Sequence, residues 1–370
     1  MFDCSSAAPP QPLSPSKMLL PLLSLILTAS VTPILEGGPV SVVVQDSAKW
    51  VQYEAGEGAG AGKHIVLIGG DEEYRSEEGL PMLARILAVR HGFRCTVLFS
   101  QKPESGEIDP EDQVNIPGIE HVKDADMLVL FLRFREPTDE WMTQFQAYMD
   151  TGRPILGIRT STHAFAYKRN KESPFAHYNW TDKTWPGGWG KQILGETWVA
   201  HHGAHGSEST RGVIEASSYQ HPILRGVIDI WGGTDVYRIR ELPEDATVLV
   251  RGMVMAGMQP DSPPVISTKN VPMIPIIWTR EIALPDGGTR RTICSTIGAS
   301  QDLLSNDLRR CLINSCYWGL GLESQIPEQS DARLVGTYEP TPFGFGKYTR
   351  GIWPKDHALS AEERAAATAK

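Results

Sequence analysis

Short apolar runs alternate with amphipathic stretches through the first half of the folded region. His64–Gly70 is an apolar run that ends in two glycines, which is typical of a buried strand. Leucines and isoleucines at helical spacing follow Ser76 and indicate a helix that continues to about Arg90. The same patterns predict further strands over 93–99, 127–131 and 155–158, and a helix that begins at Pro137 and stops at Gly152.

This order of elements predicts the fold class. Strands that alternate with helices are typical of a parallel sheet with right-handed crossover connections. We therefore expect an α/β protein with a doubly wound, mainly parallel sheet, flavodoxin-like in strand order, with helices on both faces.

The second half of the chain resumes the strand signal after an interruption. Residues 168–190 contain three tryptophans and paired glycines, and this composition predicts a long loop. The folded domain is expected over 63–325, and residues 326–370 are expected to form a surface strap and a disordered tail. Within the domain, strands are predicted near 198–201, 212–216, 247–251, 274–279 and 291–295, and a closing helix over 302–320.

The N-terminal residues are arranged like an export signal. Lys17 precedes the apolar run Met18–Leu35, in which small residues follow the leucines. We expect residues 1–36 to be a signal peptide or an uncleaved anchor and the protein to be exported, periplasmic or secreted; an ordinary apolar segment is the alternative. Contact with a membrane is expected only through an uncleaved segment. Residues 37–62 are rich in glycine and alanine and predict a flexible linker.

The net charge disfavours one class of partner. The 370 residues carry a formal net charge of -9, which disfavours nucleic-acid binding because that needs a basic face.

The cysteines show no metal-binding or redox spacing. None of the five lies in a C-x-x-C pair, so we expect buried free thiols; a structural disulfide is the alternative.

A sharp polar turn follows the fourth predicted strand. Pro154–Ile158 leads into Arg159-Thr160-Ser161, at the end of a strand where open α/β sheets bind ligands. The segment Pro154–His163 resembles the elbow of class I glutamine amidotransferases, with Arg159 at the position of the nucleophilic cysteine. The segment that resembles the site of the partner histidine reads Gly298-Ala299-Ser300. Because glutaminase chemistry needs a thiolate and its base, we expect no such activity.

Later segments resemble the ThuA-like (trehalose-utilisation) branch of this superfamily over roughly 63–346. This resemblance implies a glutamine amidotransferase-like fold and a link to sugar metabolism, without a defined reaction. The segments that carry it are 201–206 (HHGAHG), 231–237 (WGGTDVY), 298–304 (GASQDLL) and 342–346 (PFGFG).

A histidine cluster supplies the candidate chemistry. His201, His202 and His205 lie within five residues, and His163 is expected nearby. Imidazoles transfer protons near neutral pH and also ligate zinc, copper, iron or nickel, so both proton transfer and a divalent metal are open. Ordinary surface or hydrogen-bonded histidines are the third interpretation.

Substrate-binding candidates surround the same turn. Arg159 and Thr160 would anchor a substrate, although a buried Arg159 paired with Glu72 or Asp235 is an equal alternative. Glu72, after the first strand, is a catalytic candidate that with Asp235 would orient the histidines. The candidates for stacking on sugar rings are Trp185 and Trp189, unless they pack in the core or in a lid.

Two functions follow from these residues. The first is an enzyme that acts on a sugar or oxidised sugar derivative by acid–base or metal-assisted chemistry. The second is a noncatalytic carbohydrate-binding or scaffolding module. A shared active centre requires Arg159 to lie within ~15 Å of His201 or His202, the span of a small-ligand pocket.

Overall fold

A computed structural model describes residues 49–360, 362–363 and 366. The predicted signal or anchor over 1–36, most of the predicted tail and part of the predicted linker lie outside these residues. Within the described residues, every helix is too short or too polar to cross a lipid bilayer.

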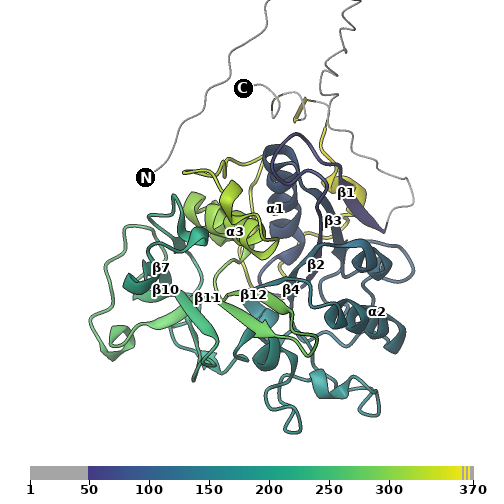
Figure 1. The fold of residues 1–370 in the computed structure, drawn as a ribbon, viewed down its shortest axis with the longest axis horizontal. Coiled ribbons are helices and arrows are strands. Elements are labelled where there is room, and N and C mark those ends of the chain that lie inside the picture. Colours follow the sequence, from purple (N-terminus) through teal and green to yellow (C-terminus); the bar gives the residue numbers. More distant parts are fainter. Residues whose placement is uncertain (1–48, 361, 364–365, 367–370) are drawn as a thin grey trace, which may run out of the picture. The chain divides into compact units, whose positions relative to one another are not determined.

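The central feature is a ten-stranded mixed sheet (Figure 1). Its core has the order β3-β2-β4-β5-β12, and each neighbouring pair in it is parallel. Counted along the chain, this is the flavodoxin-like order 2-1-3-4-5, so the predicted α/β fold class is confirmed. These core strands are β2 (His64–Gly70), β3 (Arg94–Phe99), β4 (Met127–Leu132), β5 (Ile155–Ile158) and β12 (Thr289–Ser295).

Antiparallel strands extend the core on both sides, so the sheet is less parallel than the sequence predicted. Strands joined by short turns pair antiparallel, because a parallel crossover needs a dozen or more residues. β11 and β12 show this directly, since only five residues separate Ala283 from Thr289. The antiparallel strands are β1 (Trp50–Tyr53), β7 (Ser209–Ile214), β8 (Trp231–Gly232), β10 (Ala246–Met255) and β11 (Ile274–Ala283).

Part of the predicted linker is in fact the edge strand β1. It pairs antiparallel with β3, from Trp50 opposite Leu98 to Tyr53 opposite Cys95. Its alternate residues Val51 and Tyr53 are buried, which is the period-two pattern of a half-buried strand. The glycine-rich residues that follow hid this short signal.

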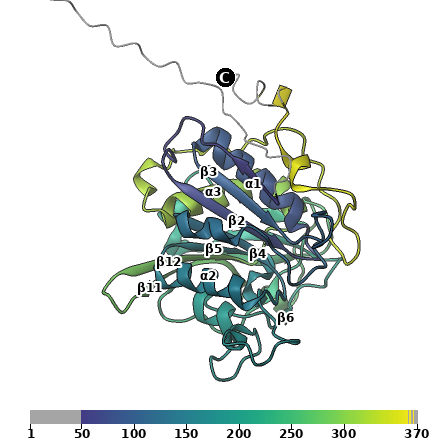
Figure 2. The ribbon, with the colours of Figure 1, turned by 90° about the vertical axis from the view of Figure 1, so that its right-hand side faces the viewer.

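Helices cover both faces of the sheet (Figure 2). α1 (Ser76–His91) and α3 (Asn306–Gly319) pack on one face, and α2 (Asp139–Asp150) packs on the other. In β2, Ile65 and Leu67 belong to the core on the face covered by α1 and α3, and Val66 and Ile68 belong to the core on the face covered by α2. They alternate because successive strand residues point to opposite faces of the sheet.

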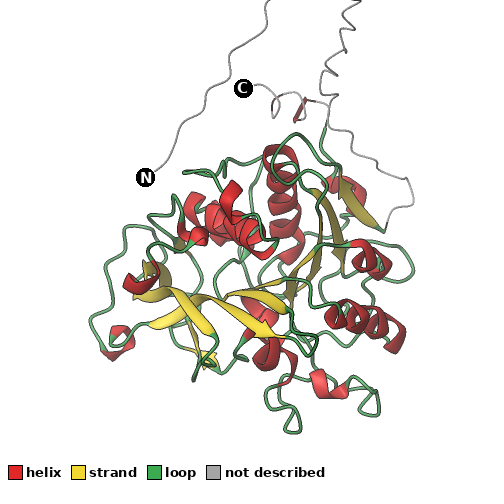
Figure 3. Ribbon diagram, viewed as in Figure 1, coloured by secondary structure: helices red, strands yellow, loops and turns green. Residues whose placement is uncertain are grey.

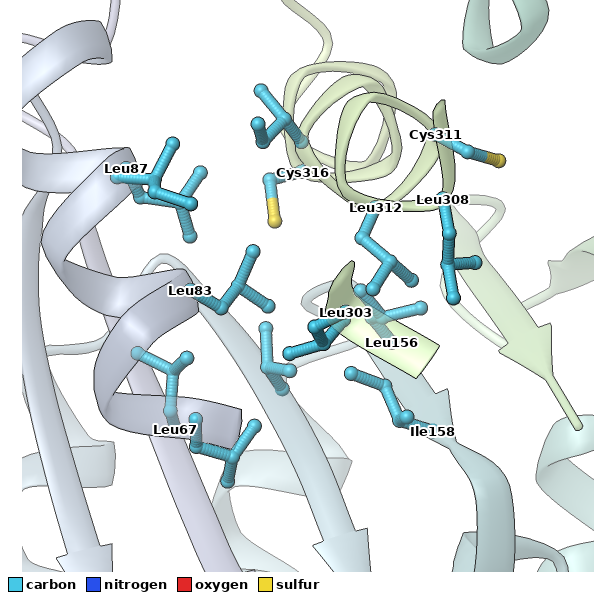
Figure 4. Close-up of a cluster of buried hydrophobic side chains, with 14 of the residues drawn as sticks. Leu67, Leu83, Leu87, Leu156, Ile158, Leu303, Leu308, Cys311, Leu312 and Cys316 are labelled. Atoms are coloured by element: carbon cyan, nitrogen blue, oxygen red, sulfur yellow. The ribbon is translucent and has the colours of Figure 1, made fainter. Parts of the chain in front are cut away.

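The core between α1 and α3 is apolar and contains thiols. Leu83 and Leu87 of α1 point toward Leu312 and Cys316 of α3 (Figure 4). Within the described residues every cysteine is free and buried, as the sequence predicted, and Cys4 lies outside them. The described thiols are those of Cys95, Cys294, Cys311 and Cys316.

Two predicted elements differ from the structure. The predicted closing helix is divided at Ser305 into η8 (Ser300–Leu304) and α3, because the Ser305 side chain accepts a hydrogen bond from the Leu308 amide and caps α3. The predicted strand near 198–201 is only β6 (Ala200–His201), which pairs with β9 (Tyr237–Arg238) in a separate two-stranded sheet.

Loops and short helices make up much of the remaining chain (Figure 3). The predicted strap is described as far as residue 360, and its Gly344 amide donates to the carbonyl of Glu73 (2.7 Å), in the loop after β2. The short helices are η1 (Ile119–Asp124), η2 (Arg159–His163), η3 (Ala176–Tyr178), η4 (Gly190–Leu194), η5 (Ala216–Ser218), η6 (Pro222–Leu224), η7 (Thr268–Asn270), η9 (Glu323–Gln325) and η10 (Pro354–His357).

Candidate functional site

The polar residues of the candidate site meet at the carboxyl edge of the parallel core. Glu73 follows β2, Arg133 follows β4, Arg159 follows β5 and Thr296 follows β12. The carboxyl ends of parallel strands lie at one edge of a sheet, where α/β proteins bind ligands. The fold therefore gathers these side chains from four strands.

The elbow after β5 is a strained turn. Arg159 has a φ of 48°, in the left-handed region that residues with a side chain rarely adopt. Ser161 fixes the turn against β4, because its Oγ donates to the Leu130 carbonyl (2.7 Å) and accepts from the Leu132 amide (3.2 Å). Such a turn places the residue at its apex with little freedom.

The Arg159 guanidinium is buried, and both of its terminal nitrogens bond to the protein. Nη2 lies 3.1 Å from Oδ1 of Asp235, and Nη1 donates to the carbonyls of Asp235 (2.8 Å) and Thr296 (2.6 Å). The guanidinium carbon lies 3.7 Å from the ring centroid of Tyr237 and 4.5 Å from that of Tyr74. Arg159 is therefore buried and paired with Asp235, which is the alternative that the sequence left open.

Thr160 is buried beside Arg159 in the same elbow. Its side chain is buried, and Oγ1 donates to the carboxylate of Asp71. The other carboxylate oxygen of Asp71, Oδ1, accepts hydrogen bonds from the backbone amides of Glu73 (2.7 Å) and Tyr74 (2.6 Å). Thr160 therefore links the elbow to the loop after β2, and that loop sets the position of Glu73.

Asp235 holds two imidazoles at the centre of the site. Oδ2 lies 2.8 Å from Nδ1 of His201, and Oδ1 lies 3.2 Å from Nδ1 of His205. Burial would raise the pKa of the Asp235 carboxyl, but hydrogen bonds from both histidines and the charge of Arg159 outweigh burial and hold this pKa below its usual range. Asp235 is thus a buried anion that orients His201 and His205.

The loop that carries Asp235 is fixed by a second buried carboxylate. Asp302 accepts hydrogen bonds from the Thr234 amide (3.1 Å) and hydroxyl (2.6 Å). It also accepts from the amides of Gly298 and Ala299, each at 3.0 Å, in the segment after β12. The segment that resembles the amidotransferase histidine site therefore supports Asp235 through Thr234.

Glu73, rather than Glu72, reaches the histidines. Oε1 of Glu73 lies 3.4 Å from Nε2 of His205, and burial raises the pKa of Glu73. Glu72 instead pairs with Arg133 and Arg135. Sequence reasoning chose Glu72 and missed Arg133, although Arg133 directly follows a strand of the parallel core and could have been found from that position.

The other two predicted histidines take different places. His163 is buried among aromatic rings, and burial with the nearby charges of Arg133 and Arg159 holds its pKa well below the usual value, so it is neutral and shielded from solvent. His202 turns away from Asp235, and its Nε2 lies 2.8 Å from the Lys269 carbonyl. The structure brings only His201 and His205 together on Asp235.

The predicted sugar-stacking tryptophans lie away from the cluster. Trp189 is completely buried in the α2 core against Phe145 and Phe165, since a large apolar ring gains most from full burial. Trp185 packs on His177 and Tyr178. Trp198, which the sequence analysis assigned only to a strand, is the tryptophan whose ring reaches His201, at 5.8 Å between centroids.

The C-terminal strap contributes two phenylalanines to the site. The ring centroid of Phe343 lies 5.2 Å from that of His205, and Phe345 is 60% exposed with its ring 5.0 Å from the Arg133 guanidinium. The sequence predicted a strap here, without a place in the site. The aromatic residues between glycines at 343–346 were the available signal.

The structure thus brings the elbow arginine and the histidine cluster together, as the sequence-based hypothesis of a shared centre required. Arg159 and His201 both contact the carboxylate of Asp235, well within the required span. Together they form a cluster of two imidazoles, one buried aspartate and Glu73. Arg133 and Phe345 lie beside this cluster. The arrangement can exchange protons with a small polar ligand or hold a cation.

No protein-family model and no curated protein matches this sequence. A protein from Bacteroides uniformis that is described as ThuA-like is structurally similar, at 14% identity, over 72% of this chain and 95% of that chain, with a TM-score of 0.45. One of the same description from Parabacteroides merdae matches at 13% identity over 80% and 99%, with a TM-score of 0.42.

A glutaminase domain is also among the similar structures. The domain from Trypanosoma brucei CTPS, with bound acivicin, matches at 9% identity over 74% of this chain and 99% of that chain, with a TM-score of 0.33.

Proposed function

We propose that this chain is a ThuA-like enzyme that acts on a small sugar or an oxidised sugar derivative at the cluster around Asp235. The chemistry is acid–base or metal-assisted, and glutamine is not a substrate. The observation that carries the proposal is that His201 and His205, with side chains 35% and 34% exposed, share one fully buried carboxylate. Reactive groups that a buried anion orients toward solvent are arranged for a ligand.

The surroundings of the cluster support a carbohydrate as the substrate. Sugars offer C–H faces that pack on aromatic rings and hydroxyls that bond to charged groups. Phe345 exposes its ring beside Arg133, and Arg133 lies between Glu72 and Glu73. An aromatic platform next to a guanidinium and carboxylates therefore lies beside the two imidazoles.

The cysteines support the exclusion of glutaminase activity. Among the described residues, the elbow carries no thiol and Cys294 is the cysteine in the neighbouring strand β12. Burial raises the pKa of the Cys294 thiol well above its usual value, so it is a poor source of thiolate. The other described cysteines, Cys95, Cys311 and Cys316, are buried as well.

A substrate screen with matched variants tests the proposal. Purified protein is assayed on disaccharides, keto-sugars and sugar lactones, with glutamine as a negative control and with and without divalent metal. We expect turnover of at least one sugar and a loss of ~100-fold or more in His205→Ala. His177→Ala, whose ring packs on Trp185 and Tyr178, is expected to retain wild-type turnover.

Two results would count against the proposal. Sugar binding without turnover would favour a noncatalytic carbohydrate-binding module and overturn the enzymatic part. If the protein neither binds nor turns over any of the sugars, the proposed substrate class is overturned as well.

A further inference from the structure

We infer that His201, His205 and Asp235 bind a single divalent transition-metal ion, with Zn²⁺ as the ion to test. The inference deepens the proposed function, since it assigns a cofactor to the same cluster. It depends on the positions and chemistry of three side chains and does not require the substrate to be known.

The donor set is suited to such an ion. One ligand atom from each of the three residues lies within 4.8 Å of the other two. Zinc bonds to imidazole nitrogen and carboxylate oxygen are about 2.0–2.2 Å long, so neighbouring ligand atoms of one ion are about 3 Å apart. The two Nδ1–carboxylate distances, 2.8 and 3.2 Å, have this spacing. Two histidines and one carboxylate are also a recurrent ligand set of catalytic metal centres.

The surroundings of the three residues resemble the outer shell of a metal site. A ligating histidine usually has its second nitrogen held by a carboxylate or carbonyl, which fixes the ring and its tautomer. Nε2 of His205 lies 3.4 Å from Glu73, while its Nδ1 faces Asp235. Arg159 holds the carboxylate of Asp235 in turn. His205 and Asp235 are therefore oriented by partners that lie behind them.

The backbone brings the two ligand loops close together. His201 lies opposite Tyr237 in the β6–β9 pair, two residues after Asp235. Gly203 allows the histidine loop to approach, because a Cβ at this position would lie 3.0 Å from Cβ of Asp235. Asp302 fixes the other loop through Thr234. Such preorganisation reduces the cost of ordering the ligands when an ion binds.

The geometry leaves coordination positions for water or substrate. Three protein ligands with an open side are typical of catalytic sites, whereas structural zinc sites are closed by four. About a third of each imidazole faces solvent, and Phe343 packs against one side of His205. A bound divalent ion would polarise a carbonyl or hydroxyl oxygen of the substrate.

Calorimetry tests this inference directly. The full chain is stripped with a chelator and titrated with Zn²⁺ without any sugar. We expect one site per chain, with affinity reduced ~100-fold or more in His201→Ala and in His205→Ala. His202→Ala is the matched control, since it removes a neighbouring imidazole that bonds to the Lys269 carbonyl, and it should bind like the wild type. Circular dichroism checks that each variant folds.

A second measurement identifies the ligands. Co²⁺ bound to the wild type should show visible d–d absorption that is lost in His205→Ala and kept in His202→Ala. Absence of Zn²⁺ binding by the wild type, or equal affinity in His205→Ala, would overturn the inference.

The failure of this inference can be told apart from failure of the proposed function. Turnover of a sugar by metal-free protein that binds no Zn²⁺ would overturn the metal site and leave the function standing. Zn²⁺ binding through His201 and His205 without any sugar turnover would support the metal site and overturn the proposed enzymatic function.

Discussion

Arg159 and Asp235 form an ion pair, with Nη2 3.1 Å from Oδ1 and neither side chain exposed to solvent. The pair connects the elbow after β5 to the loop of Asp235, whose carboxylate orients His201 and His205. A guanidinium cannot give up its charge, so Arg159 stays positive in the core and depends on this carboxylate and on the ring faces of Tyr74 and Tyr237. The arginine at the apex thus acts on the site through Asp235.

Removing this carboxylate should destabilise the whole fold. In Asp235→Ala the charge of Arg159 is left buried without its partner, and we expect the free energy of unfolding to fall by about 3–5 kcal/mol in urea denaturation. Asp229→Ala, which breaks the exposed pair with Arg211, should cost less than about 1 kcal/mol. Similar losses in the two variants would contradict the role assigned to the buried pair.

The stability of the protein should fall on mild acidification because of His64. Burial, with a smaller effect from the charge of Arg94, lowers the pKa of His64 to about 4. In the unfolded chain the pKa of a histidine is about 6.5. Between this pH and the pKa of His64 in the folded protein, the unfolded chain binds a proton that the folded protein does not. The stability present at pH 7 is therefore lost as the pH falls. Between pH 7 and pH 5 the wild type should lose about 1–2 kcal/mol more than His64→Gln.

Urea titrations of both proteins at the two pH values measure this difference. Equal losses would mean that His64 takes up its proton equally in the folded and the unfolded state. A larger loss in His64→Gln than in the wild type would contradict the sign of the effect.

The two tryptophans of the long loop should differ in their effect on stability. Trp189 is completely buried in the α2 core, so Trp189→Ala should lower the free energy of unfolding by about 3–5 kcal/mol. Trp185→Ala removes a partly exposed ring, so its cost should be clearly smaller. Any sugar affinity should survive in Trp185→Ala. A loss of sugar binding with unchanged stability would restore the original stacking hypothesis for this residue.

The parallel core was predictable because its strands are buried on both faces. Such strands read as continuous apolar runs, and His64–Gly70 and Met127–Leu132 stand out from the sequence for that reason. Arg133 directly follows one of these runs, and Glu73 lies in the loop after the other, so both lie at the ligand-binding edge. Pattern reasoning placed Glu72 at this edge and missed Arg133. Short strands such as β1 carry too few residues for this signal.

The content of the site was less predictable because its contacts join distant parts of the chain. The aromatic residues between glycines at 343–346 were a local signal, but their spacing does not show that the Phe343 ring lies against His205. Whether Arg159 is buried depends on Asp235, 76 residues later, and on Tyr74 from the loop after β2. Local spacing likewise does not distinguish His201 from His202, whose rings have different partners.

A substitution of Glu73 should separate orientation of the ligands from ligation itself. Glu73 contacts the far nitrogen of His205 and does not belong to the three proposed ligands, so Glu73→Gln should weaken Zn²⁺ binding by ~10–100-fold without abolishing it. Glu72→Gln is the matched control, because it removes a neighbouring carboxylate that pairs with Arg133 and Arg135. Calorimetric titration of both variants measures the difference. If Glu73→Gln and Glu72→Gln lose equal affinity for Zn²⁺, the local negative charge would explain the effect. If neither variant loses affinity, Glu73 does not orient His205 as a metal ligand.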